Sequence, residues 1–170
     1  TVLDSARFRY LLSKKLNVDI RNVHGYVIGE HGDSQLPLWS ATHIAGKKIS
    51  EYFDDPQYNI TDEEKAEIAK DVKCAGAEII KRKGATYYAI AVAINTILES
   101  LLRNQNTIRT VSSVINGKYG IDDVALSLPS IVNAEGVKEI IDLPLTAEEQ
   151  SALEYSAEQL KMILQSGKDM

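Results

Sequence analysis

Apolar residues recur every three or four positions in four stretches of the chain, and this spacing predicts amphipathic helices. The predicted helices cover residues 4–16, 61–82, 86–103 and 146–165. A threonine followed three residues later by glutamate begins the second and fourth helices, and this pattern is a capping box. Asp4 or Ser5 is placed to cap the first helix, whose apolar stripe comprises Leu3, Ala6, Tyr10 and Leu11.

Shorter apolar runs bounded by turn residues predict strands. Residues 22–28 are predicted to form one strand, and residues 35–53 to be extended with a turn at residues 46–48 and a loop after them at residues 54–57. Beyond residue 106 the pattern predicts a three-stranded antiparallel meander, with strands over residues 107–115, 124–128 and 137–141. Helices mixed with antiparallel strands predict an α+β fold.

The composition is that of one ordinary globular domain over residues 1–170. Hydrophobic residues make up 44% of the chain and charged residues 25%, and no linker or repeat divides it. The net charge of -5 argues against a nucleic-acid or anionic-membrane partner, and no apolar run approaches the length of a membrane span. Because Cys74 is the single cysteine, no internal disulfide can form, and a reducing, cytoplasmic setting is expected.

The candidate chemistry is concentrated in two short segments. In Gly29-Glu30-His31-Gly32-Asp33-Ser34 a histidine lies between two glycines, just past a predicted strand. Histidine is the side chain best suited to carry a proton near neutral pH. Asp4 and Arg7 share one face of the first predicted helix because they are three residues apart. Each segment has an ordinary alternative, namely a hydrogen-bonded histidine in a polar turn and a helix cap with an intrahelical ion pair.

Taken together, these three side chains suit a small 2-hydroxy or 2-oxo acid. A carboxylate bonded to one imidazole nitrogen fixes the tautomer, so that the other nitrogen of His31 can exchange a proton with a substrate oxygen. Arg7 can hold the acid group through two parallel hydrogen bonds. None of these groups can deliver or take a hydride, so the chemistry requires a cofactor.

Two other kinds of site fit the sequence poorly. The spacing of Gly25, Gly29 and Gly32 matches neither G-x-G-x-x-G nor G-x-x-x-x-G-K-[ST], so a phosphate-binding loop is rejected. His24 and His31 lie seven residues apart across a strand and a turn, and no cysteine is near them. No metal site is therefore predicted from these histidines and Asp33.

Two motifs carry a resemblance to a known family. Leu3-Asp4-Ser5-Ala6-Arg7-Phe8-Arg9 and Gly29-Glu30-His31-Gly32-Asp33-Ser34, in this order and separation, closely resemble the L-lactate dehydrogenase family. The resemblance covers essentially the whole chain but only the C-terminal half of a family member. It implies a catalytic domain with long helices packed on an antiparallel sheet, in which Asp4 orients His31, His31 is the acid/base and Arg7 binds the substrate carboxylate. It also implies NAD as cofactor and the interconversion of pyruvate and L-lactate.

The resemblance extends to four further positions. Thr86 matches the threonine that lines the substrate pocket, and Ile90 matches the apolar residue behind the nicotinamide ring. Arg9 and His24 match residues that bind fructose 1,6-bisphosphate across a subunit interface in a bacterial subset of the family. For Arg9 the ordinary alternative is a pair with a surface carboxylate.

The sequence also departs from the family pattern. It contains no G-x-G-x-x-G strand-turn-helix of a nucleotide-binding half, and Arg109 matches no mobile substrate-closing loop. We therefore expect the chain to be a piece of a longer protein and, by itself, to be essentially inactive. Two alternatives stay open: a malate dehydrogenase, which uses the same histidine, aspartate and arginine, or a non-catalytic module that binds sugar phosphate.

The helix predicted over residues 86–103 indicates assembly into oligomers. Its apolar face and the first predicted helix, residues 4–16, exceed what one small domain needs to cover, and we expect a homo-oligomer, with a tetramer as the family's usual state. The face comprises Ile90, Ala93, Ile94, Ile97, Leu98 and Leu101.

Overall fold

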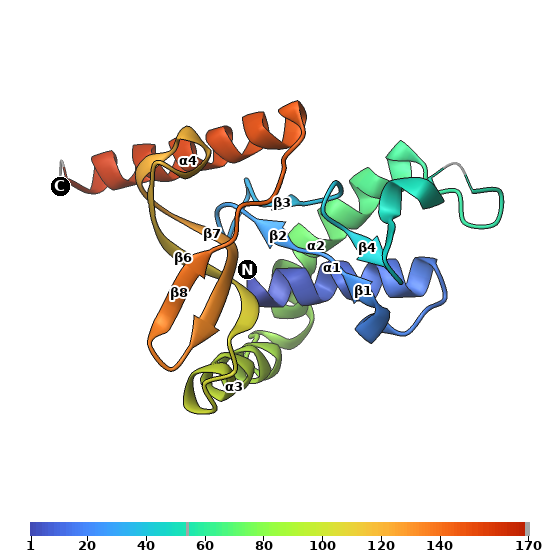
Figure 1. Ribbon diagram of the computed structural model, residues 1–170, viewed down its shortest axis with the longest axis horizontal. Coiled ribbons are helices and arrows are strands. Elements are labelled where there is room, and N and C mark those ends of the chain that lie inside the picture. The colour runs from blue at the N-terminus through green and yellow to red at the C-terminus, as the bar shows by residue number, and fades with distance from the viewer. Residues whose placement is uncertain (54, 169–170) are drawn as a thin grey trace.

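The computed structural model describes residues 1–53 and 55–168, so Asp54 in the predicted loop lies outside the described residues. In the described ranges the helices are α1 (Val2–Lys15), α2 (Asp62–Lys83), α3 (Tyr88–Leu102) and α4 (Ala147–Lys168). They pack with antiparallel strands, which confirms the α+β prediction. In Figure 1, α4 lies along one side of the three-stranded meander, α3 lies on another, and α1 runs through the middle of the molecule. No helix in the described ranges is long and apolar enough to cross a membrane.

The first helix begins earlier than predicted and buries a different stripe. Its N-cap is Thr1, which makes no side-chain capping hydrogen bond, so the prediction that Asp4 or Ser5 caps it is wrong. Tyr10, from the predicted stripe, is half exposed. The apolar residues that are buried along this helix are Phe8, Leu12 and, just past its end, Leu16. Spacing of four aligns them on one face, so the periodicity was helical but the face was misassigned.

The region between α1 and α2 differs most from the sequence prediction. The single strand expected over residues 22–28 is two short strands, β1 (Val23–His24) and β2 (Val27–Ile28). They belong to different sheets, because β1 pairs with β4 (His43–Ile44) and β2 pairs with β3 (Leu36–Pro37). The turn expected at residues 46–48 lies at residues 45–46, because Lys47 and Lys48 form β5 (Lys47–Lys48). A 3-10 helix, Ile49–Tyr52, follows where extended chain was predicted.

Gly25 marks the break between β1 and β2. A Cβ at this position would come within 3.0 Å of both Phe8 Cε1 and Thr42 Oγ1. The chain therefore passes very close to the first helix here, and any larger residue would require the side chains of Phe8 and Thr42 to shift.

The meander forms as predicted, with longer first and second strands and a third strand that begins one residue earlier. It consists of β6 (Thr107–Asn116), β7 (Asp122–Asn133) and β8 (Gly136–Ile140), in sheet order β6-β7-β8. Gly117 has φ +79° in the first turn, where turn residues were predicted. The chain at Gly29 joins this sheet through an isolated antiparallel bridge to Ser127. The meander thereby holds the start of the segment that carries His31.

The two predicted capping boxes are both present. Thr61 Oγ1 accepts from the Glu64 amide at 3.3 Å, and Thr146 Oγ1 accepts from the Glu149 amide at 3.2 Å. At the end of α2, Gly84 takes a left-handed conformation with φ +78°, which stops the helix. The next helix starts at Tyr88 rather than at residue 86, so Thr86 lies in the link between two helices.

Two hydrophobic cores hold these elements together. One lies around α1 and includes Val72 of α2; its largest buried side chain is Phe8, edge-on to Trp39 with centroids 5.0 Å apart. The other joins β2 and β3 to the meander and to α4, with Leu126 and Leu153 among its members. The segment carrying His31 follows β2, where these two cores meet.

Candidate functional site

A buried carboxylate is the centre of the site. Asp4, in the first turn of α1, is 2% exposed, and its two oxygens have different partners. Oδ2 lies 2.7 Å from His31 Nδ1, and Oδ1 accepts from Arg7 Nη1 at 3.2 Å. A buried charge is costly unless it is paired and hydrogen-bonded, and here both oxygens are satisfied. The structure thus brings Asp4, Arg7 and His31 together, although Asp4 and His31 are 27 residues apart in the sequence.

The histidine is exposed on the side away from Asp4. Its side chain is 68% exposed, although the carboxylate it contacts is buried. Because a carboxylate accepts hydrogen bonds, the contact favours a proton on Nδ1 and leaves Nε2 to exchange one with a bound molecule. This is the geometry that an acid/base histidine needs.

The turn that carries His31 is anchored from the far end of the chain. Ser156, fully buried on α4, accepts from the Glu30 amide at 2.8 Å, and its Oγ lies 3.0 Å from Ser34 Oγ. The Glu30 carboxylate in turn accepts from Ser34. At Gly29, φ is +88° and a Cβ would lie 2.7 Å from Ser156 Oγ, so glycine is required there. Sequence reasoning missed Ser156 because nothing in its own segment indicates a role.

The cleft beside these groups is formed by three helices. Asp4 and Arg7 come from α1, Lys73 and Ile80 from α2, and Ile90 from the first turn of α3. Thr86, from the link between α2 and α3, also lines it. The predicted residues His31, Asp4, Arg7, Thr86 and Ile90 therefore surround one cleft.

One ion pair at this cleft was not expected from the sequence. Lys73 Nζ lies 3.3 Å from Asp33 Oδ1, and both residues line the cleft. The pair joins α2 to the turn after His31. Both side chains are well exposed, so the pair adds little stability, but it places a cation at the rim.

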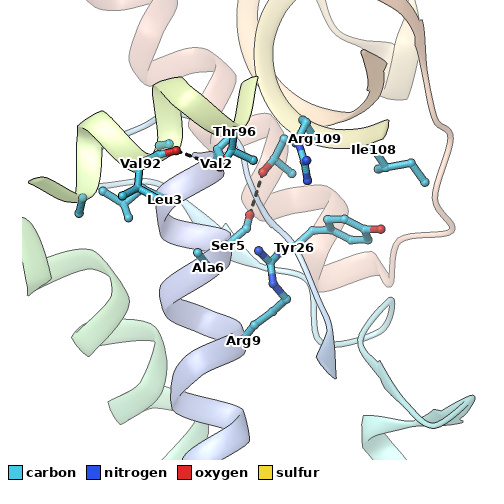
Figure 2. Close-up of a pocket in the computed structure, with 13 residues that line it drawn as sticks. Val2, Leu3, Ser5, Ala6, Arg9, Tyr26, Val92, Thr96, Ile108 and Arg109 are labelled. Carbon is cyan, nitrogen blue, oxygen red and sulfur yellow. Dashed lines mark hydrogen bonds between the residues drawn. The ribbon is translucent and has the colours of Figure 1, made fainter. Parts of the chain in front are cut away.

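Arg9 points away from this cleft, as its position on α1 predicts. It lines a second pocket with Tyr26 and Arg109 (Figure 2). Its Nη1 donates to the Gly25 carbonyl at 3.1 Å. Burial is the main cause that lowers the pKa of Arg9; Tyr26 raises it and Arg109 lowers it further. His24 is exposed on β1, opposite His43. In the described part of the chain no hydrogen bond joins Arg9 to His24.

Comparison with known proteins identifies the family. The model of the lactate/malate dehydrogenase alpha/beta C-terminal domain matches residues 1–170. The chain belongs to the lactate/malate dehydrogenase family. The resemblance seen in the two sequence motifs is thereby confirmed.

Similar members of this family are bacterial L-lactate dehydrogenases. The chain is 52% identical over 165 residues to that of Thermoanaerobacter pseudethanolicus, covering 97% of this chain and 53% of the relative. It is 49% identical to L-lactate dehydrogenase 1 of Clostridium acetobutylicum, over 98% of this chain and 53% of the relative. The chain thus spans about half the length of the curated relatives it matches.

Solved structures in the family have the same fold. A Clostridium thermocellum L-lactate dehydrogenase is 67% identical, with a TM-score of 0.88 over 98% of this chain and 54% of that one. The ligand-bound minor L-lactate dehydrogenase of Enterococcus mundtii is 42% identical, with a TM-score of 0.93 over 98% of this chain and 52% of that one. These likenesses support the described arrangement of helices around the meander.

Proposed function

We propose that the chain is the C-terminal catalytic domain of an NAD-dependent L-lactate dehydrogenase that interconverts pyruvate and L-lactate. The observation that carries the proposal is the contact of His31 Nδ1 with the buried Asp4 at 2.7 Å, beside Arg7 and at a cleft. The similar L-lactate dehydrogenases support the choice of substrate. The nucleotide-binding half would be contributed by another part of the full-length protein, which acts in the cytoplasm.

His31 is the proton carrier in this proposal. In pyruvate reduction its Nε2 gives a proton to the ketone oxygen, and in lactate oxidation it takes the proton of the hydroxyl. Asp4 keeps Nδ1 protonated and stabilises the positive charge when the ring carries both protons. Because Asp4 is buried and both of its oxygens are hydrogen-bonded within the protein, it orients the His31 ring and has no free oxygen to bind the substrate.

Arg7 binds the substrate carboxylate. Its guanidinium has five N–H donors, and the observed bond to Asp4 uses one of them. The side chain is 17% exposed, so the remaining donors act from a partly desolvated position, where a charge-assisted pair is stronger than in water. Thr86 adds a hydroxyl to the wall of the same cleft.

The cleft also fits a nicotinamide. Ile90 is 43% exposed and lines the same cleft as His31. Its apolar surface is therefore available to pack against a nicotinamide ring beside His31. NAD, when bound, supplies or accepts the hydride at C2 of the substrate. The role of this chain is to orient the substrate and to move the proton on its oxygen.

A regulatory role for Arg9 and His24 belongs to the same proposal. They would bind fructose 1,6-bisphosphate at an interface between subunits of a tetramer. The apolar surface of α3, where Val92 is 66% exposed and Leu102 is 84% exposed, supports assembly with other protein surface.

Turnover by the full-length protein tests the proposal. We expect rapid NADH oxidation with pyruvate and a much lower kcat/KM with oxaloacetate, and only traces of activity from the 170-residue chain alone. A preference for oxaloacetate would replace the lactate assignment with malate dehydrogenase. Absence of turnover with either acid, combined with binding of fructose 1,6-bisphosphate, would favour the non-catalytic module.

A further inference from the structure

The sequence contains one asparagine that is followed by glycine, in Asn116-Gly117. Asparagine is a thermolabile residue, and a following glycine has no side chain to hinder attack of its amide nitrogen on the asparagine side-chain carbonyl. In the structure Asn116 ends β6 and Gly117 begins the turn to β7, and both residues are exposed. The labile step is therefore in contact with water.

The amide of Gly117 is nevertheless held by two acceptors. Its N–H donates to the Ile121 carbonyl at 3.0 Å and to Asp122 Oδ1 at 2.5 Å. Asp122 is the first residue of β7 and pairs with Asn116 across the ladder of β6 and β7, so its carboxylate lies beside the labile step. A proton held by two acceptors, one of them charged, is harder to remove than a proton that faces water. The attacking nitrogen is thereby kept in its unreactive, protonated form.

We propose that Asn116 is a site of spontaneous deamidation and that the Asp122 carboxylate slows the reaction by holding the Gly117 amide. The Gly117 nitrogen loses its proton and attacks Asn116 Cγ, and the new C–N bond closes a succinimide ring while the side-chain nitrogen leaves as ammonia. Water then opens the ring at one of its two carbonyls, which gives aspartate or isoaspartate. One water is consumed and one ammonia is released, and no oxidation state changes.

The modification would act on a turn that holds α4. The Tyr119 hydroxyl, in this turn, accepts from the Leu143 amide at 2.8 Å, and the Tyr119 carbonyl accepts from Gln150 Nε2 at 2.9 Å. Figure 1 shows this end of the meander beside α4. A carboxylate at position 116 would face Asp122 across the ladder, and like charges directly opposite each other destabilise a strand pair. Deamidation is therefore expected to loosen the hairpin and to lower the melting temperature.

Peptide mapping by mass spectrometry of the 170-residue chain tests the proposal. The wild type and three variants, Asp122→Ala, Asp122→Asn and Asp123→Asn, are kept at physiological temperature and mildly alkaline pH, and the converted fraction of Asn116 is followed with time. A peptide of residues 112–126 is the reference for a step without the fold. Melting curves establish that each variant is folded, and Asp122→Asn carries the test if Asp122→Ala is not.

Asp123→Asn is the matched control. Asp123 is exposed and adjacent to Asp122, and its replacement removes the same charge, whereas the bond to the Gly117 amide comes from Asp122. Asp123 has φ +58°, a left-handed conformation that asparagine also tolerates. The control therefore separates the hydrogen bond from the general loss of negative charge in this turn.

We expect the peptide to deamidate fastest and the wild type most slowly. Loss of one hydrogen bond at an exposed position is expected to raise the rate at Asn116 in Asp122→Ala about threefold to tenfold. Asp122→Asn keeps a neutral oxygen acceptor, so we expect a smaller increase there. The rate in Asp123→Asn should match that of the wild type.

Two results would overturn the role of Asp122: a folded wild type that deamidates at Asn116 as fast as the peptide, or a folded Asp122 variant that does so no faster than Asp123→Asn. Faster conversion of another asparagine in Asp122→Ala would overturn the assignment of the site to Asn116. The mapping requires neither NAD nor turnover, so an inactive full-length protein would refute the proposed function and leave this result unaffected.

Discussion

The helices α1 and α3 both line the cleft beside His31, yet their apolar residues differ in exposure. On α1, Phe8 and Leu12 have no exposed surface, and the helix turns Asp4 and Arg7 toward the cleft. On α3, Val92 is 66% exposed and Ile94 is 52% exposed, and the buried residue in this helix is a serine, Ser100. Since both sequences have helical periodicity, the comparison teaches that periodicity identifies an apolar face but not what covers it.

The buried apolar residues of α1 stabilise the fold of this chain, whereas the exposed ones of α3 are available for assembly with another protein surface. Burial of a Phe or Leu side chain contributes roughly 1.5–3 kcal/mol, so the α1 stripe stabilises this chain itself. The α3 surface contributes little of that kind until another protein surface covers it. The cleft lies between these helices. Its polar residues Asp4 and Arg7 come from α1, and its exposed apolar residue Ile90 comes from α3.

The largest effect is expected for Asp4→Asn, which tests the α1 side of the comparison. The amide keeps the shape but can donate to Nδ1 and so favours the wrong tautomer of His31. We expect kcat for pyruvate in the full-length enzyme to fall by about 10³–10⁴-fold. Asp19→Asn is the control, since Asp19 pairs with Arg21 on the surface away from the cleft. Equal activities of the two variants would contradict the role of Asp4.

Phe8→Ala tests whether the α1 stripe holds the fold. The side chain is fully buried and packs edge-on against Trp39, so its removal leaves a cavity. The free energy of unfolding of the 170-residue chain should fall by about 3–5 kcal/mol in denaturant titration. A loss below about 1 kcal/mol, the usual cost of an average substitution, would show that α1 is not the centre of this core.

Ser156→Ala tests how the polar side of the cleft is anchored. The change leaves the partly buried Glu30 amide without its acceptor, which costs about 1–3 kcal/mol of stability. The turn carrying His31 then loses its hydrogen bonds to α4, so His31 is less well positioned. We therefore expect kcat to fall by a larger factor than KM rises. Ser151→Ala, on the exposed side of α4, is the matched control. A stability loss with unchanged kcat would limit Ser156 to a purely structural role.

The smallest effect is expected on α3. Val92→Thr keeps the shape of an exposed side chain, and it should change the unfolding free energy of the 170-residue chain by no more than about 0.5 kcal/mol. The same substitution in the full-length protein should weaken its oligomer, as measured by sedimentation. A large loss of stability in the short chain would mean that the chain itself covers this face.

Local signals account for what the sequence predicted well. Thr61 and Thr146 form capping boxes with residues three positions away, and the meander turns at Gly117 where turn residues occur. The Asp4 and His31 motifs indicated a shared site because carboxylate, arginine and histidine have complementary chemistry, although their contact spans 27 residues.

Contacts between distant segments account for what the sequence did not predict. The split of residues 22–28 depends on Gly25 passing close to Phe8 and Thr42, which no local pattern encodes. Ser156 meets Glu30 across 126 residues of sequence. The face of α1 that is buried was misassigned because α2 and the β-hairpins, not the helix itself, decide which face is covered.

The central claim is that His31 moves the substrate proton, and the most direct test compares two histidine variants of the full-length protein. His31→Gln removes the group that contacts Asp4, whereas His43→Gln alters a histidine on β4 that bonds to the Ala41 carbonyl outside the cleft. Pyruvate-dependent NADH oxidation should fall by about 10²–10⁴-fold in His31→Gln, the usual contribution of a general acid, and stay near the wild-type rate in His43→Gln. Wild-type turnover by a folded His31→Gln enzyme would contradict the account.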